Sequence, residues 1–299
     1  MSSKDSKFKE YSPLLIMAGI LLLVQILALT LAMPMEVNNM RAFENPESAF
    51  NSFYYIGIII VFTLILLLAI KRDQQWIIQL FILFAVASTL YYGLFAFTSM
   101  FNIAPTLGMS VSLISAIGMT GILYKFPEWY IIDIVGIIIG AAASSIFGIS
   151  LAIMPAIILL VILAVYDAIS VYKTKHMVSL AEGVMDLKLP ILFVIPKRLD
   201  YSFREESFNN DDKERDAFFM GLGDAVMPTI LVVSANVFIE HSGIISYPAL
   251  GGVIGTVIGF FALSVFIMKG KPQAGLPFLN SGVILGYFVG VLLSGVPIF

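Results

Sequence analysis

Nine long apolar stretches constrain this chain more than any other feature of its sequence. Each has about 17–25 residues, the length that an α-helix needs to cross the hydrocarbon layer of a bilayer. They lie at about 12–33, 49–70, 75–98, 103–124, 129–148, 151–172, 217–239, 247–268 and 275–296. Strands of a membrane barrel would be shorter and would alternate apolar with polar residues, so the stretches predict helices. We therefore expect an all-α membrane protein with nine transmembrane helices.

The composition agrees with a lipid environment and excludes several kinds of site. Apolar residues make up 59 % of the chain and charged residues 12 %, whereas about a quarter of a typical soluble domain is charged. The chain has no cysteine and two histidines, which excludes disulfides, thiolate metal sites and His-rich metal sites. The net charge of −3 gives no indication of nucleic-acid binding.

The basic residues predict which side of the membrane each end of the chain faces. Lys and Arg concentrate in the cytoplasmic loops of membrane proteins. If the N-terminus is cytoplasmic, 16 of the 17 basic residues lie inside and only Arg41 lies outside. The loop that holds Arg41 also carries Glu36, Glu44 and Glu47. We expect a cytoplasmic N-terminus and, after nine crossings, an external Phe299.

One hydrophilic segment, residues 173–216, holds 17 of the 37 charged residues. We expect it to be a cytoplasmic linker between a six-helix part (1–172) and a three-helix part (217–299). Residues 187–196 within it are apolar but too few to span, which predicts either a short interfacial strand or a helix lying on the membrane. For residues 201–216 we expect a solvated and mobile loop.

Five acidic residues lie in or near the apolar stretches: Glu128, Asp133, Asp167, Asp224 and Glu240. A carboxylate in hydrocarbon is costly, and such residues usually face a bundle interior or a water-filled cavity where they have a function. Glu128 and Glu240 are at helix ends close to water, and Asp133 is about one turn inside its helix. We expect structural roles for these three.

The other two, Asp167 and Asp224, are expected at the same depth. Asp167 precedes the cytoplasmic end of the sixth helix by about six residues, and Asp224 follows the start of the seventh by about seven. At 1.5 Å per residue, both lie roughly 8–10 Å below one membrane face. If the two helices are neighbours, their carboxyl groups meet.

Two carboxyl groups in this arrangement can hydrolyse a peptide bond. They cannot both ionise easily at close range, so they share a proton. The ionised group takes a proton from an attacking water, and the protonated group donates to the carbonyl oxygen and later to the leaving nitrogen. The mechanism needs no metal, cofactor or covalent intermediate.

The residues that precede the two aspartates suit this chemistry. Tyr166 comes directly before the first, and its phenol can orient a carboxyl group or a substrate. Gly221, Leu222 and Gly223 come before the second, and the two glycines would let an extended substrate backbone approach. Gly-x-Gly is also common in membrane helices for packing alone, so its weight comes from its place beside an aspartate.

These motifs resemble those of the intramembrane aspartyl proteases of the presenilin and signal-peptide-peptidase family. Tyr166-Asp167 matches the family's YD motif, and 221–224 matches GxGD, with Pro228 following at the familiar distance. The resemblance covers essentially the whole chain. It implies a presenilin-like fold with Asp167 and Asp224 as the catalytic pair.

A third family motif, Pro-Ala-Leu, stands at the start of the ninth helix. A literal copy at 248–250 opens the expected eighth helix on the external side, where we interpret its proline as an ordinary helix start. The position that matches the family is Pro277-Phe278-Leu279, with Phe278 in place of the alanine. The resemblance implies that these three residues border the active site.

The resemblance also implies a location and partners. A cytoplasmic N-terminus is the presenilin orientation, whereas signal peptide peptidases are inverted. The end of the sixth helix (172–177) and the Leu- and Pro-containing part of the linker look like archaeal members of the family, which implies a prokaryotic plasma membrane. The implied substrates are transmembrane proteins or peptides that enter laterally from the lipid bilayer. The oligomeric state is left open, a homo-oligomer included.

Two other functions remain open on the residue pattern. A channel or proton-coupled transporter could use Asp167 and Asp224 as relay sites, although no repeat relates the first six helices to the last three and no regular polar stripe marks a pore. A structural scaffold could use the same aspartates only to hydrogen-bond across helices.

Overall fold

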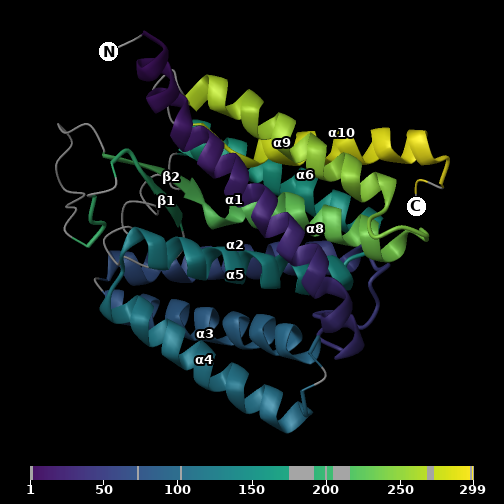
Figure 1. Cartoon of the computed structure of the whole chain (residues 1–299), viewed down its shortest axis with the longest axis horizontal. Coiled ribbons are helices and arrows are strands. Elements are labelled where there is room, and N and C mark those ends of the chain that lie inside the picture. Colours follow the sequence, from purple (N-terminus) through teal and green to yellow (C-terminus); the bar gives the residue numbers. More distant parts are fainter. Residues whose placement is uncertain are drawn as a thin grey trace.

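The computed structural model describes residues 3–72, 74–101, 103–174, 192–198, 201–204, 216–267, 273–296 and 298. These residues form nine α-helices, a π-helix and a two-stranded sheet (Figure 1). The elements are α1 (Ser3–Val37), α2 (Phe50–Lys71), α3 (Gln75–Ser99), α4 (Pro105–Lys125), α5 (Trp129–Ser150), α6 (Ile153–Ile169), η1 (Ser170–Thr174), β1 (Leu192–Pro196), β2 (Ala217–Gly221), α8 (Leu222–Phe238), α9 (Tyr247–Ile267) and α10 (Leu276–Ser294).

Eight of the described helices are long and apolar enough to cross a membrane. The ninth, α8, has 17 residues and a length of about 25 Å. The expectation that this helix begins at residue 217 is wrong, because residues 217–221 form β2. Strand and helix together make the seventh membrane segment.

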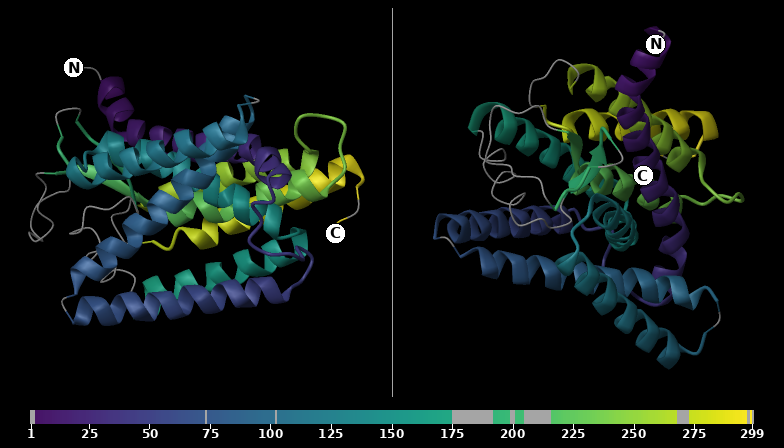
Figure 2. Two further views of the ribbon diagram at one scale, coloured as in Figure 1. Left: turned by 90° about the horizontal axis from the view of Figure 1, so that it is seen from below. Right: turned by 60° about the vertical axis from the view of Figure 1, so that its left-hand side comes forward.

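α8 lies at the centre of the bundle and packs against α1, α5, α6, α9 and α10. In Figure 1, α9 and α10 lie on one side of it, while α5 separates it from α3 and α4. α2 packs mainly on α6 and only weakly on α3, and both views of Figure 2 show it at the periphery. Because other helices surround α8, its middle, from Ala225 to Ala235, is mostly buried.

Glycines bring α9 and α10 into close contact. A Cβ atom added to Gly251 would lie 2.2 Å from the carbonyl oxygen of Gly286, and one added to Gly255 would lie 2.1 Å from that of Gly282. Only glycine permits two backbones to approach so closely. The pair therefore packs tightly, and this packing fixes where α10 begins.

The sheet pairs β1 with β2 in an antiparallel register that places Val194 opposite Phe219. Within the apolar segment 187–196, residues 192–196 are thus a strand, while 187–191 lie outside the described residues. Phe193 and Val194 are fully buried, since β1 packs on α5. β2 leads directly into α8.

The solvated loop expected at 201–216 is wrong for residues 201–203, whereas Arg204 is exposed as expected. Phe203 is 2 % exposed, and its ring lies 6.2 Å from that of Phe219 on β2. The hydroxyl of Ser202 donates a hydrogen bond to Glu128 Oε1 at 2.9 Å. Burial of the phenylalanine ring accounts for this packing. Residues 205–215 lie outside the described residues.

Candidate active site

Asp167 is buried near the C-terminal end of α6, with 7 % of its surface exposed. Its Oδ2 accepts a hydrogen bond of 3.1 Å from the backbone N–H of Leu276, the first residue of α10. The backbone of Gly275 is also hydrogen-bonded to this carboxyl group. Asp167 therefore lies against the N-terminus of α10, where unpaired backbone donors favour a carboxylate.

Asp224 is the third residue of α8, not a residue two turns inside a longer helix. The strand before it explains the difference. Five residues of strand advance the chain by about 16 Å, whereas five residues of helix advance it by about 7.5 Å. β2 therefore carries the chain into the bundle, and α8 begins close to the aspartate that ends the Gly-Leu-Gly-Asp sequence. The backbone of Gly221, at the junction, is hydrogen-bonded to the Asp224 carboxyl group.

The start of α10 brings the two aspartates together. A Cβ atom at Gly275 would lie 2.6 Å from Asp224 Oδ1, while the next residue, Leu276, bonds to Asp167. Two consecutive residues, Gly275 and Leu276, thus lie against the two carboxyl groups. The two carboxyl groups are close enough for their charges to interact, and α6 packs against both α8 and α10.

The glycines before Asp224 differ in their surroundings. A Cβ atom at Gly221 would lie 3.3 Å from Asp224 Oδ2, so this glycine contacts the carboxyl group itself. Gly223 is exposed, and a Cβ atom there would meet no atom within 4 Å. Leu222 between them contacts the position of a Cβ at Gly140 on α5, at 3.4 Å. The open space beside the aspartate is therefore on the side of Gly223.

The other expected site residues lie on α6 and at the start of α10. Tyr166 is half-buried beside Asp167. Pro277 is in the first turn of α10, Leu279 is fully buried, and the ring of Phe278 lies 5.3 Å from that of Phe266 on α9. The start of α10 thus combines the Pro-Phe-Leu sequence with direct contact to the aspartates.

The literal Pro-Ala-Leu lies elsewhere. Pro248 is buried in the first turn of α9, and its Cα would lie 2.6 Å from a Cβ at Gly290, near the end of α10. This end of the α9–α10 pair is opposite to the end at which Gly275 and Leu276 contact the aspartates. Pro248 begins a helix and packs against its neighbour.

Comparison with known proteins decides what this arrangement is. The model of the family described as "Signal-peptide peptidase, presenilin aspartyl protease" matches residues 18–296. The chain belongs to this family of aspartyl proteases. A comparison with curated proteins gave no match.

Two solved structures support the assignment. Both are described as a presenilin family intramembrane aspartate protease, one in space group C222 and one in P2. The first is 41 % identical with a TM-score of 0.72 over 94 % of this chain and 99 % of that one. The second is 41 % identical with a TM-score of 0.70 over 95 % and 99 %. The protein is an intramembrane aspartyl protease with the presenilin fold, and neither match supports a transporter or channel.

Backbone atoms of the protease contribute to the site in a way that the sequence did not reveal. Gly275 and Leu276 contact the aspartates through positions with no distinctive side chain. Tyr172, in η1, donates a hydrogen bond of 2.8 Å to Gln273 Oε1 and accepts one of 3.3 Å from the N–H of Ala274. These bonds hold the segment before α10 against the end of α6. A glycine directly before Leu-Pro was the only available signal, and it is equally typical of an ordinary helix start.

Of the three other acidic residues in or near the membrane segments, Asp133 and Glu128 have structural contacts. Asp133 Oδ1 accepts a hydrogen bond of 2.8 Å from the N–H of Val194 on β1. Glu128 accepts the bond from Ser202, and Glu240 is exposed just beyond α8. Among the described residues, no group of three or more His, Asp or Glu side chains could hold a metal ion.

Proposed function

We propose that this protease hydrolyses peptide bonds within the transmembrane segments of membrane proteins, with Asp167 and Asp224 as its catalytic pair. The observation that carries the proposal is the start of α10, where Gly275 lies against Asp224 and the N–H of Leu276 bonds to Asp167. Two carboxyl groups from distant parts of the chain thereby share one place inside a bundle of membrane helices.

The reaction needs only these two groups and a water molecule. The ionised aspartate removes a proton from water as the water oxygen bonds to the peptide carbonyl carbon. The protonated aspartate donates its proton to the carbonyl oxygen. The tetrahedral gem-diol then breaks its C–N bond: the aspartate that took the proton from water gives it to the leaving nitrogen, and the other aspartate, now ionised, takes a proton from one diol hydroxyl as the new C=O forms. A new carboxyl terminus and a new amino terminus result, and the pair again shares one proton.

The open side of Gly223 is where we place the substrate backbone. A helix cannot present its carbonyl groups to the aspartates, because they are hydrogen-bonded within the helix. A substrate segment must therefore unwind locally before cleavage. The absence of a side chain at Gly223 leaves room for an extended strand beside Asp224.

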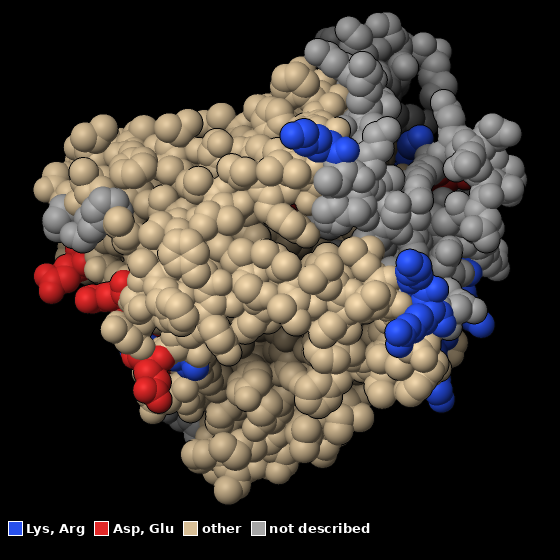
Figure 3. Space-filling model, turned by 180° about the vertical axis from the view of Figure 1, so that it is seen from behind, with Lys and Arg blue, Asp and Glu red and all other residues tan. Residues whose placement is uncertain are grey.

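We also propose that the N-terminus and the 173–216 linker are cytoplasmic and that the C-terminus is external. Figure 3 supports this, because basic side chains gather at one end of the visible face and acidic ones at the other. Lys71, Lys125 and Lys173 lie in the last turns of α2, α4 and η1, the ends expected to be cytoplasmic. Both aspartates would then lie near the cytoplasmic face.

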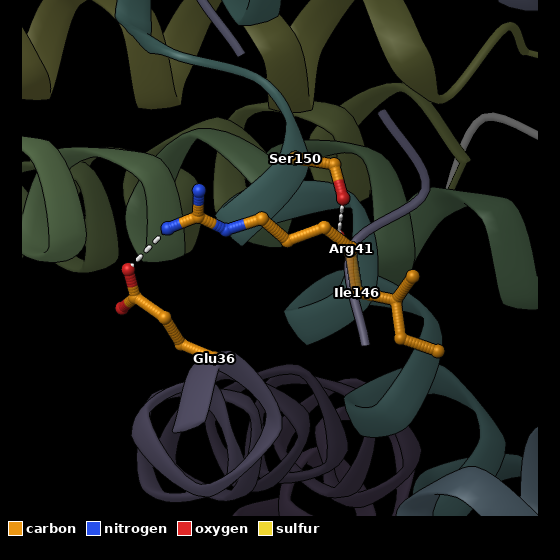
Figure 4. Close-up of polar contacts among 4 residues, drawn as sticks. All are labelled: Glu36, Arg41, Ile146 and Ser150. Carbon is orange, nitrogen blue, oxygen red and sulfur yellow. Dashed lines mark hydrogen bonds and ion pairs between the residues drawn. The ribbon is translucent and has the colours of Figure 1, made fainter. Parts of the chain in front are cut away.

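The single basic residue assigned to the outside has its charge neutralised. The guanidinium of Arg41 pairs with Glu36 Oε1 (Figure 4). The adjacent backbone is anchored to α5, because the N–H of Ala42 donates to Ser150 Oγ at 2.7 Å and Ser150 in turn donates to the carbonyl of Ile146. Arg41 therefore remains the single exception to the distribution of 16 basic residues on one side and one on the other. Cysteine labelling from either side of sealed vesicles tests the orientation.

The test of function uses the protein reconstituted in proteoliposomes with a transmembrane substrate. Asp167→Asn and Asp224→Asn should each lower the cleavage rate by about 10²–10⁴-fold, because an amide can neither accept nor donate the transferred proton. Glu240→Gln, the same chemical change at an exposed residue outside the site, is the control and should keep full activity.

A substrate analogue with a hydroxyl-bearing tetrahedral centre should inhibit the wild type, because it resembles the transition state. Full activity in either aspartate variant would rule out the proposed pair. Loss of thermal stability in both variants without any cleavage by the wild type would instead favour a scaffold role.

A further inference from the structure

Asp133 is a buried carboxyl group that the two-aspartate reaction does not use. It lies in the second turn of α5 with 9 % of its surface exposed. Burying such a group is costly unless it is hydrogen-bonded. Its Oδ1 accepts the backbone N–H of Val194 at 2.8 Å, so the contact joins α5 to β1.

The register of the sheet shows why this N–H is available to a side chain. Lys197 N–H donates to the carbonyl of Asp216 at 2.8 Å, which makes these two residues a hydrogen-bonded pair. Such pairs alternate along an antiparallel ladder, so Val194 and Phe219, three positions further, form a non-hydrogen-bonded pair. The N–H of Val194 therefore points away from β2, and Asp133 occupies this free edge of β1.

The same face of α5 also contacts Phe193 on β1 and Leu222 at the start of α8. One turn after Asp133, a Cβ atom at Gly136 would lie 3.0 Å from Cε1 of Phe193. One turn further, Gly140 contacts Leu222, the residue between the two motif glycines. The spacing of three and four residues puts all three positions on one side of the helix. α5 thus supports both β1 and the start of α8.

We propose that Asp133 is a positioning residue for catalysis. It holds the free edge of β1, β1 sets the register of β2, and β2 runs without interruption into Gly221 and Asp224. The inference rests on the proposed function, because Asp133 acts only through Asp224. A slip of one residue would move a strand by about 3.3 Å and turn its side chains to the opposite face, whereas a misplacement of about 1 Å can lower a rate by 10²-fold.

Two substitutions at Asp133 separate positioning from simple packing. Asp133→Leu removes the acceptor, and we expect kcat to fall about 10- to 100-fold with KM within about twofold of the wild type. Asp133→Asn keeps a carbonyl oxygen that accepts the same N–H, so kcat should stay within about threefold. Ser145→Ala is the control on the same helix, because its hydroxyl bonds to carbonyls of Ala28 and Ala141, away from β1. Equal losses in the leucine and asparagine variants would overturn the proposal, as would full kcat in the leucine variant.

A cross-link reads the position of β2 without relying on activity. The chain has no cysteine, and Pro196 lies opposite Ala217 in a non-hydrogen-bonded pair. Such a pair has a Cα separation of about 4.5 Å, within the range of a disulfide. Pro196→Cys with Ala217→Cys should oxidise quickly in the wild-type and Asp133→Asn backgrounds and several-fold more slowly with Asp133→Leu. Unchanged oxidation in the leucine background would overturn the proposal.

Gly136→Ala provides an independent perturbation if Asp133→Leu does not accumulate in the membrane. The added methyl group pushes on Phe193 and leaves every polar group in place, so kcat and the cross-linking rate should both fall while KM is kept. If neither falls, β1 does not position the site and the proposal is wrong. Wild type and Asp224→Asn are assayed alongside. Failure of the wild type to cleave would refute the proposed function. The cross-linking rate does not depend on cleavage, so it tests the positioning of β2 separately.

Discussion

The contact between Gly275 and Asp224 yields the sharpest test of the active-site geometry. A Cβ atom at residue 275 would lie 2.6 Å from Asp224 Oδ1, 2.8 Å from its Cγ and 2.9 Å from Oδ2, where ordinary van der Waals contact begins at 3.4 Å. Gly275→Ala therefore requires the carboxyl group and α10 to separate by about 0.8 Å. Gly275 has φ −78° and ψ −45°, which alanine adopts freely, so the backbone adds no strain.

The expected effect is on the rate. Because a misplacement of about 1 Å can lower a rate by 10²-fold, kcat should fall about 10- to 100-fold, equivalent to about 1.4–2.7 kcal/mol of activation free energy. Cleavage of a transmembrane peptide in proteoliposomes gives kcat and KM. Gly118→Ala is the matched control, because a Cβ atom there meets nothing within 4 Å, and this variant should be as active as the wild type. Unchanged kcat in Gly275→Ala would refute the close approach of the two segments.

Two further predictions concern the neighbours of the aspartates. Gly223→Ala should leave the melting temperature unchanged, since its Cβ meets no protein atom, but lower kcat/KM by about tenfold if the substrate backbone passes there; equal kcat/KM would place the substrate elsewhere. Pro277→Ala loosens the start of α10 and should lower activity about 3- to 10-fold, whereas Pro248→Ala should lower the free energy of unfolding by about 0.4–1 kcal/mol and keep activity. Kinetics and thermal melts on both proline variants test this pair, and the opposite pattern would assign the motif to Pro248.

The membrane helices could be predicted from sequence because the length and polarity of an apolar run are local properties. A run of about 20 apolar residues satisfies its backbone hydrogen bonds in lipid only as a helix. The same reasoning failed at residues 217–221, because an apolar segment of five residues is compatible with helix or strand. Its partner, β1, lies within the linker and is separated from it by residues 197–216, so only long-range pairing decides that it is a strand.

The two aspartates proposed as the catalytic pair were visible for a different reason. A carboxyl group in the middle of an apolar run is costly, so Asp167 and Asp224 stand out without any knowledge of the fold. Asp133, about one turn inside its helix, stands out less, and its partner is a backbone N–H of β1 that no sequence pattern marks. The contacts of Gly275 and Leu276 are made near or through the backbone, and a backbone contact leaves no trace in residue identity.

The sequence by itself therefore determined a protein of nine membrane helices, its two aspartates and the motifs beside them. These are consequences of hydrophobicity and of the cost of burying charge, which each segment expresses alone. Only the tertiary structure decided that the strand β2 carries the chain to Asp224, that α5 bonds to its partner strand β1 through Asp133, and that the start of α10 lies against the two aspartates. These features depend on hydrogen bonds and close approach between segments distant in the chain, and such contacts exist only once the helices have packed.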